Sequence, residues 1–400
     1  MHNAAPGGAA RSLHGLLRGL PAGAVAPTVL APDGPAIARF LADGIPVLYI
    51  PDVAMFQSIA GVPLRGVRLI ELARFAWNTR HGRAFRAAIR SVRPDIVHLN
   101  DRGMLHAGAL AKRLGIPVVM HARCVADRRT GWAHALTVRS MRRLADRVVA
   151  IDESVRWSLR ELDNCDVIHN PVMPARARAY SPSLDGRIRV GMLGNLAVHK
   201  GVWDLLACAD RLRDRRDIVF RIAGGNTRPA AFYHSAAGRI AAALGLAPDL
   251  ETAARRWVTE RGLDDNIQFL GNIDDVDEFL AETDIMVFPS HLNGPGRSVI
   301  EAGIAGVPSV VALVDRIEDV VQDGVTGLIV PERDPAALAT AVLRLVDDAS
   351  LRRRLGDAAR ARYAFQFDPQ RIGRQMINLY EAVLDARASL PKSASFAANY

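Results

Sequence analysis

Short runs of β-branched and apolar residues alternate with helical patterns along nearly the whole chain. Apolar residues spaced by three or four positions, as in Val202, Leu205, Leu206 and Ala209, predict amphipathic helices between these runs. Such alternation is typical of α/β proteins with parallel sheets. The pattern predicts strands at 28–31, 46–50, 95–99, 117–121, 147–151 and 167–169 in the first half, and at 188–193, 218–223, 267–270, 285–288, 309–313 and 328–330 in the second.

The strands and helices fall into two repeats of similar length, joined by a proline-containing stretch at 170–185. Two domains also suit the length, because domains usually have about 100 to 200 residues. The predicted division is an N-terminal domain over 1–178, a C-terminal domain over 179–365, a helix over 366–388 that packs back towards the first domain, and a frayed tail over 389–400.

Composition indicates a globular protein, since 50% of the residues are hydrophobic and 23% are charged. Three scattered cysteines, Cys124, Cys165 and Cys208, indicate neither a disulfide framework nor a thiolate metal site. No apolar run is long enough to span a bilayer, and the first twenty residues lack the pattern of a secretory signal. We therefore expect a cytoplasmic protein.

Basic residues concentrate in the first half of the chain. Residues 1–180 hold 25 Lys and Arg against 13 Asp and Glu, whereas residues 181–400 hold 26 against 29. This imbalance predicts a surface that faces something anionic, unless it reflects a general preference for arginine, since the chain has only three lysines. Segment 51–93, with eight arginines around Phe75 and Trp77, is either a basic amphipathic element that touches anionic lipid or an ordinary crossover with solvated arginines.

Lys200 stands between a predicted strand, 188–193, and the helix that begins near Val202. Ligands bind at this edge of a parallel sheet. The ammonium group and the helix amides can act together on a phosphate. The alternative is a solvated lysine, but a lysine at this place in an arginine-rich chain favours the phosphate.

A second motif follows the strand that ends at Phe288, where a glycine-rich turn leads to a short helix near Ser298. Amides of Ser298 and Val299 would lie in its first turn and could meet an anion. The stretch from Ser298 to Glu301 also has the spacing of a capping box, in which Glu301 only satisfies the helix start. At the beginning of the chain, Gly7 and Gly8 precede a helical pattern and form either an anion-binding turn or a flexible start.

The order of these motifs resembles that of the retaining glycosyltransferases of family four over about residues 5–388. That family has the GT-B fold, an α/β fold of two Rossmann-like domains facing a central cleft. The resemblance rests on Asp95-Ile-Val-His-Leu-Asn100, Val118-Val-Met-His121, Ala145 to Ile151, Ile168-His-Asn-Pro171, Gly194 to Gly201, Pro289-Ser290, Glu301-Ala-Gly, Gly306-Val-Pro308, Glu318 to Val330 and Asp334-Pro-Ala-Ala-Leu338.

The resemblance implies a nucleotide-sugar donor held mainly by the second domain. Lys200 would neutralise its diphosphate, Glu301 would accept hydrogen bonds from the ribose, and His121, otherwise a packed or capping histidine, would meet the transferred sugar. The implied catalytic residues are His121, Lys200 and Glu301, and the implied donor-binding residues are Gly7, Gly8, Asn195, Lys200, Asn293, Gly296, Arg297, Ser298, Val299 and Glu301.

Three features depart from the family pattern. Asn195 stands where the family commonly has an arginine, and Asn293 stands where it has a glutamate. Arg297 is expected to supply the missing charge. No strand is predicted before Gly7, so we expect the natural start of the protein to lie upstream.

The implied reaction is the retaining transfer of a sugar to the hydroxyl of a sugar or lipid-linked acceptor, in the assembly of a cell-surface polysaccharide or glycolipid. We expect peripheral contact with the inner face of an anionic membrane. We do not expect nucleic acid to be a partner. We expect no cofactor and no metal, because Lys200 and helix amides would support the leaving diphosphate. The alternatives are a non-catalytic homologue that binds sugar nucleotides and a GT-B nucleotide-sugar epimerase.

Overall fold

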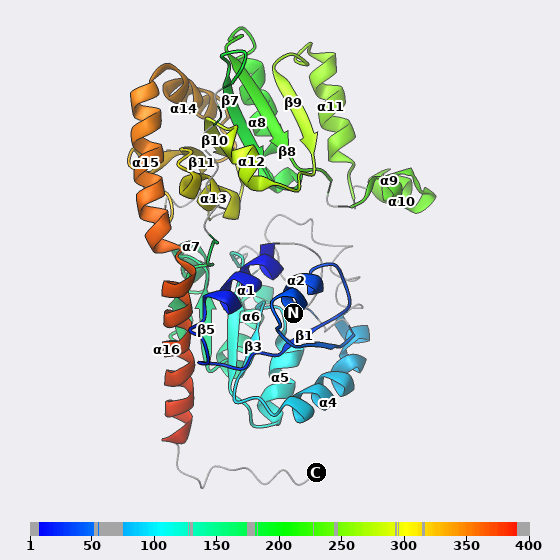
Figure 1. The fold of residues 1–400 in the computed structure, drawn as a ribbon. Coiled ribbons are helices and arrows are strands. Elements are labelled where there is room, and N and C mark those ends of the chain that lie inside the picture. The colour runs from blue at the N-terminus through cyan, green and yellow to red at the C-terminus, as the bar shows by residue number, and fades with distance from the viewer. Residues whose placement is uncertain are drawn as a thin grey trace. The chain divides into compact units, whose positions relative to one another are not determined.

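The computed structural model describes residues 8–51, 55, 75–126, 128, 131–173, 181, 183–226, 228–243, 247–292, 294, 296–313 and 317–389. The chain divides into two compact α/β units (Figure 1). The first unit comprises residues 1–171 and 368–400, and the second comprises residues 172–367. The predicted boundary between residues 178 and 179 lies outside the described residues, as does the predicted tail beyond Ser389.

The second unit is built on a parallel sheet, six-stranded in the described ranges, in the order β12-β11-β10-β7-β8-β9. The strands are β7 (Ile188–Leu193), β8 (Ile218–Ala223), β9 (Ile267–Gly271), β10 (Ile285–Phe288), β11 (Ser309–Ala312) and β12 (Gly327–Val330). Polar side chains are few in these strands, and β10 and β12 have none, because helices cover both faces of the sheet. Buried Arg189 at the start of β7 pairs with Asp284, which precedes β10, with 3.0 Å between Nε and Oδ2.

Helices cover each face of this sheet (Figure 1). Residues of α8 (Val202–Arg211), α11 (Leu250–Glu260) and α14 (Pro335–Asp347) form one core with the strands. On the other face lie α12 (Val276–Ala281), α13 (Arg297–Ala305) and α15 (Ala349–Gln366). The remaining helical elements of the described ranges are η3 (Val198–Lys200), α9 (Ala230–His234) and α10 (Ala236–Ala243), and the last two lie between β8 and β9 in the chain.

The first unit holds two parallel sheets in its described residues. One has the order β3-β4-β5-β6 and the other pairs β1 with β2. The strands are β1 (Val29–Ala31), β2 (Val47–Tyr49), β3 (Val97–Leu99), β4 (Val118–Ala122), β5 (Arg147–Ala150) and β6 (Cys165–Val167). The strand predicted at 167–169 is therefore displaced towards the N-terminus, because Cys165 pairs with Val148 of β5.

The four-stranded sheet is covered on both faces. The helices on one face are α4 (Gly82–Val92), α5 (Leu105–Arg113), α6 (Trp132–Leu144) and α7 (Glu153–Ser158). On the other face lie α1 (Gly8–Gly19) and α16 (Pro369–Ala388), which bury Leu16, Ile372 and Met376 against Val119 and Val149. The short helices η1 (Thr79–His81) and α2 (Ile37–Ala42) complete the unit.

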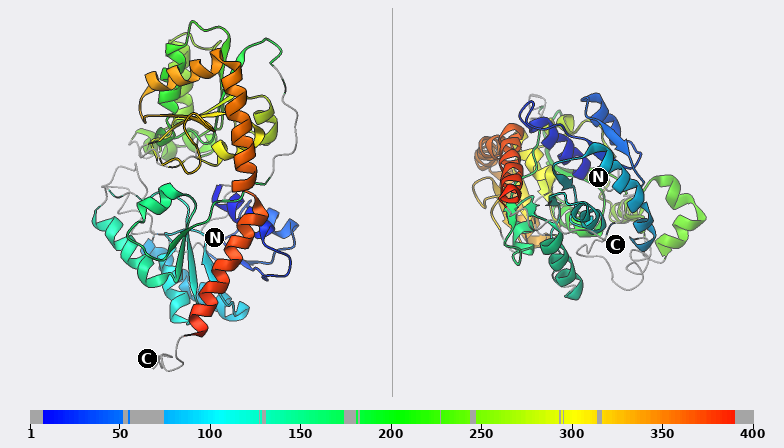
Figure 2. Two further views of the ribbon diagram at one scale, coloured as in Figure 1. Left: turned by 90° about the vertical axis from the view of Figure 1, so that its left-hand side faces the viewer. Right: turned by 90° about the horizontal axis from the view of Figure 1, so that it is seen from below.

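The helix expected over 366–388 is α16, which begins after its N-cap Asp368 and packs along α1 in the first unit (Figure 2). Gly19 and Gly373 allow the two backbones to meet. A Cβ atom on Gly373 would lie 1.9 Å from the carbonyl oxygen of Gly19, and one on Gly19 would lie 2.1 Å from that of Pro369. Side chains at these positions would push α16 away from α1.

None of the helices in the described ranges combines the length and the hydropathy that a bilayer-spanning segment needs.

Candidate functional site

The sheet of the second unit has a topological switch point between its two central strands. The chain leaves β7 towards β8 on one side, whereas β10 leads to β11 on the other. In open parallel α/β sheets, ligands bind outside the carboxyl ends of the strands at this point. Both predicted donor motifs follow these two strands, since Lys200 comes after β7 and Glu301 comes after β10. The fold therefore brings the two motifs to one edge of the sheet.

The loop that carries Lys200 packs directly on the chain after β10. Gly201 has φ of 74°, and a Cβ atom there would lie 1.8 Å from the carbonyl oxygen of Pro289. Only glycine fits such a contact in this conformation. The fold thus requires glycine at position 201. The close contact at Gly201 also fixes the backbone position from which the Lys200 side chain extends.

Hydrogen bonds hold the same two loops together. The carbonyl oxygen of His199 accepts bonds from the His291 amide at 2.9 Å and from Ser290 Oγ at 3.2 Å. His291 Nε2 lies 2.6 Å from Asp204 Oδ2 in the first turn of α8. No local pattern indicates these partners, because His291 and Asp204 are separated by 87 residues. These bonds join the lysine loop and the start of α8 to the chain at Ser290 and His291, directly after β10.

Lys200 is half-buried, and its Nζ lies 4.9 Å from the centroid of the Phe288 ring. No carboxylate in the described part of the chain lies within ion-pair distance of it. Burial lowers the pKa of this lysine, because a partly desolvated ammonium loses hydration. An unpaired cation at the switch point is the arrangement expected of a group that binds an anion.

The start of α13 differs from the capping-box alternative. Gly296 is the N-cap and its helix begins at Arg297, so Ser298 is the second helical residue and makes no side-chain cap. A Cβ atom on Gly296 would lie 2.6 Å from the Phe288 ring. The capping-box interpretation of Glu301 is wrong, since Glu301 lies five residues after the N-cap.

The Val299 amide was expected to meet an anion. It instead donates to the carbonyl oxygen of Gly296 at 3.0 Å. Ser298 remains in the first turn, where amides lack acceptors within the helix. Glu301, 9% exposed, accepts a hydrogen bond from Arg297 Nε at 2.8 Å. Arg297, which is expected to supply positive charge to the donor phosphate, is therefore paired with Glu301 in this structure.

Asn195 and Asn293 are two further predicted donor-binding residues. Asn195 is exposed on the loop that follows β7. Asn293, predicted to lie before α13, falls outside the described residues.

In the first unit, His121 lies in β4, is 1% exposed and sits beside the start of α1. Arg123 Nη2 lies 3.4 Å from His121 Nδ1, and Arg123 Nε donates to Asn100 Oδ1 at 2.9 Å. The Asn100 amide in turn donates to the Ala9 carbonyl at 3.2 Å. His121 and the start of α1 at Gly8 thus belong to one polar cluster, whereas Gly7 lies outside the described residues.

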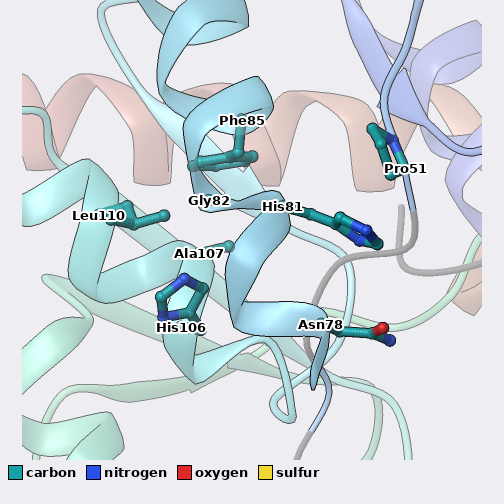
Figure 3. A pocket seen from close by; sticks show the side chains of 8 residues that line it. All are labelled: Pro51, Asn78, His81, Gly82, Phe85, His106, Ala107 and Leu110. Atoms are coloured by element: carbon teal, nitrogen blue, oxygen red, sulfur yellow. The ribbon is translucent and has the colours of Figure 1, made fainter. Parts of the chain in front are cut away.

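A separate hollow in the first unit lies at the starts of α4 and α5 (Figure 3). Its lining includes Pro51, Asn78, His81, His106 and Leu110, with no carboxylate, lysine or arginine among the lining residues. His106 packs against α4, since a Cβ atom on Gly82 would lie 2.8 Å from its Nε2. None of the predicted site residues lines this hollow.

Asp275 and Asp277 form a pair of carboxylates shortly after β9 that could suggest a metal site. The Asp275 side chain instead accepts a hydrogen bond from the Glu278 amide at 2.9 Å and caps α12. Across the described ranges, no three His, Cys, Asp or Glu residues gather as they would around a metal ion.

Models of known protein families match both halves of the chain. Residues 6–176 match Glycosyltransferase Family 4, and residues 176–362 match Glycosyl transferases group 1. Glycogen synthase of Mycobacterium tuberculosis (strain ATCC 25618 / H37Rv) is 28% identical over 316 residues, which cover 73% of this chain and 70% of that protein. The 2-deoxystreptamine N-acetyl-D-glucosaminyltransferase of Streptomyces fradiae is 30% identical over 301 residues, covering 68% of this chain and 67% of that protein.

Among solved structures, Anabaena Alr3699/HepE in complex with UDP-glucose superposes with a TM-score of 0.73 at 18% identity, covering 98% of each chain. The predicted GT-B fold, with two Rossmann-like domains, is confirmed by this likeness. The chain belongs to the group 1 glycosyltransferases, and its first half matches family four.

Replacing Lys200 by Met tests whether the unpaired ammonium is costly to the fold. Because the native pKa is lowered, the unfolded state binds the proton more tightly, and stability rises as pH increases from the native pKa towards 10.5. Lys200→Met removes this cost, so at pH 7 its melting temperature should equal or exceed that of the wild type, and the alkaline rise should disappear.

Lys112→Met is the matched control, because Lys112 Nζ forms an ion pair with Asp146 Oδ1 at 2.6 Å. Its loss should lower the unfolding free energy by up to about 1 kcal/mol. Calorimetric melting between pH 6 and 10 measures both variants. A Lys200→Met protein clearly less stable than wild type at pH 7 would contradict an unpaired, desolvated lysine.

Proposed function

We propose that this protein transfers a sugar from a nucleotide-sugar donor to an acceptor hydroxyl with retention of configuration, in the assembly of a cell-surface polysaccharide or glycolipid. Membership of the group 1 glycosyltransferases supports transfer. The Anabaena structure, which carries UDP-glucose, supports a nucleotide sugar as donor. The observation that carries the proposal is the unpaired, half-buried Lys200 at the switch point between β7 and β10.

In this mechanism the second unit stabilises the leaving group. As the bond between the sugar and the diphosphate breaks, negative charge develops on the departing phosphate oxygen. The ammonium of Lys200 and the first-turn amide of Ser298 meet that charge from fixed positions, as preorganised donors do in other enzymes. Bound diphosphate also offsets the lowering of the Lys200 pKa, because an opposite charge favours the protonated form. No metal ion is needed in this scheme.

Glu301 binds the donor ribose in this proposal. Its carboxylate is held by Arg297 Nε through Oε1, so it has a fixed orientation from which to accept bonds from hydroxyl groups. His121 serves the transferred sugar in the first unit. A ligand can approach the backbone closely at Gly8, because no atom of the described residues lies within 4 Å of where a Cβ atom would be.

Glu301→Gln should weaken donor binding about ten- to a hundredfold and leave the fold intact. Charge-assisted hydrogen bonds to ribose hydroxyls contribute roughly 1.5 to 3 kcal/mol, and glutamine keeps the shape without the charge. Glu251→Gln is the matched control, since Glu251 forms the same i,i+4 pair with Arg255 on α11, at 3.0 Å. Calorimetric titration with UDP-glucose and melting temperatures compare the variants. Equal donor affinity in both would remove Glu301 from the ribose site.

Product analysis tests the reaction itself. Chelator-treated protein incubated with UDP-glucose or another nucleotide sugar and a hydroxyl acceptor should yield a glycoside with the anomeric configuration of the donor, detected by NMR. The rate should not change on addition of magnesium, because Lys200 supplies the counter-charge. Inverted product would contradict retention, and dependence on magnesium would contradict the metal-free scheme. Interconverted donor would identify an epimerase, and binding without turnover would identify a non-catalytic homologue.

The proposal includes peripheral contact with an anionic membrane through the basic segment of the first unit. Trp77 is 63% exposed, and the guanidinium of Arg80 stacks 3.7 Å from its ring centroid. Arg83 and Arg90 on α4 are also exposed, and neither has an ion-pair partner within the described ranges. An exposed tryptophan among arginines suits a lipid interface. Much of segment 51–93, namely residues 52–54 and 56–74, lies outside the described residues.

Arg83→Ala/Arg90→Ala should weaken binding to vesicles that contain phosphatidylserine by roughly thirtyfold at low salt, because each arginine near such a surface contributes about 1 kcal/mol. The wild-type binding should itself fall as salt rises. Arg353→Ala/Arg354→Ala on α15 is the control with the same change of charge. Equal sedimentation of wild-type protein with neutral and anionic vesicles would exclude this contact.

A further inference from the structure

Three side chains form a continuous hydrogen-bonded line at the carboxyl ends of β3 and β4. Tyr380 Oη on α16 lies 2.7 Å from His98 Nδ1, and His98 Nε2 lies 3.2 Å from His121 Nδ1. The remaining nitrogen of His121, Nε2, is buried without a hydrogen-bond partner among the described residues. A buried polar atom without a partner is uncommon in native proteins and calls for an explanation.

Arg123 determines the direction in which this line donates. Its Nη2 lies 3.4 Å from His121 Nδ1, and a guanidinium group has donors only, so Nδ1 must be an acceptor. His98 then donates from Nε2, which leaves its Nδ1 to accept the proton of the Tyr380 hydroxyl. In the opposite arrangement, an N–H of His121 would face an N–H of Arg123. One assignment of protons therefore satisfies every contact, and it places the hydrogen of His121 on Nε2.

The protonation states agree with this assignment. Burial, together with the nearby Arg123, lowers the pKa of His98 to about 3 and holds the pKa of His121 well below its usual value. Burial raises the pKa of Tyr380, so its hydroxyl keeps its proton. Both imidazoles are thus neutral near pH 7, and each has one donor and one acceptor nitrogen.

We propose that Tyr380 and His98 are positioning residues that fix the tautomer and orientation of His121, so that its Nε2–H donates to a hydroxyl oxygen of the sugar during transfer. This inference rests on the proposed function. The substrate class it specifies is a pyranose or similar sugar with an oxygen that can accept this bond. This relay from Tyr380 through His98 to His121 makes α16 part of the machinery, because the close contact of Gly373 with Gly19 holds α16 in the first unit.

Tyr380→Phe removes only the terminal hydroxyl and should lower kcat about tenfold, because His98 loses the group that selects its tautomer. His98→Phe should lower kcat about a hundredfold, and the double variant should be no slower than His98→Phe alone, since the hydroxyl acts only through His98. His98→Gln should recover part of the loss by donating to His121 again. Tyr233→Phe, a buried tyrosine of the second unit, is the control and should keep wild-type kcat.

Nitrogen-15 NMR of labelled histidine provides a readout that does not depend on activity. In the wild type, His98 and His121 should each carry a proton on Nε2 at pH 7, with assignments from His98→Phe and His121→Phe. In Tyr380→Phe, the His98 signals should move towards a mixture of tautomers. A proton on His121 Nδ1, or unchanged signals and kcat in Tyr380→Phe, would overturn the relay. If NMR shows the expected tautomers but the protein transfers no sugar, the relay is supported and the proposed function is rejected.

Discussion

The close contact between the backbones of α1 and α16 is the constraint on which the first unit depends. Because Gly19 and Gly373 have no side chains, α16 lies directly on α1, and together they cover one face of the four-stranded sheet. The opposite side of α1 buries Ala10 and Leu13 against β1 and α2. The same helix therefore joins the two sheets of the unit and supports α16. Without this contact, neither the sheet face nor Tyr380 would have its present neighbours.

The second unit depends on a comparable contact at its switch point. Gly201 allows the lysine loop to reach the Pro289 carbonyl, and the His291–Asp204 pair holds the same two loops from the side. These contacts hold an ammonium group partly out of water with no carboxylate beside it among the described residues. A fold optimised for stability alone would pair or expose that group, and departures of this kind are expected where a protein binds its ligand.

Much of the fold could be predicted because parallel strands buried on both faces appear in the sequence as short apolar runs. This holds for β7, β8 and β10, whose observed bounds match the predicted ones. The signal was weaker for β6, where Asp166 interrupts the run and the predicted strand was placed two residues too late. The capping box at Glu301 failed for a different reason. Its spacing depends on which residue is the N-cap, and Gly296 takes that place against the Phe288 ring.

Polar pairs that complete the candidate site could not be predicted in this way. His98 and Tyr380 are 282 residues apart, and each stands in an apolar run that indicates only a strand or a helix. Their contact exists because α16 packs on the sheet. Packing between segments that are distant in sequence leaves no local pattern from which it could be predicted. The sequence could identify Lys200, His121 and Glu301 as residues in suitable places, but the groups that orient them come from other elements.

The unsatisfied groups at the carboxyl ends of the strands have a common chemical character. Among the described residues, the Lys200 ammonium of the second unit has no carboxylate within ion-pair distance, and His121 Nε2 of the first unit has no hydrogen-bond partner. Both groups are hydrogen-bond donors when His121 carries its proton on Nε2, as proposed above. Glu301 is an acceptor at the same edge, and Arg297 already engages one of its oxygens. Because each unit separately presents donors in excess, the ligand that completes them must be rich in acceptors, as phosphate and sugar oxygens are.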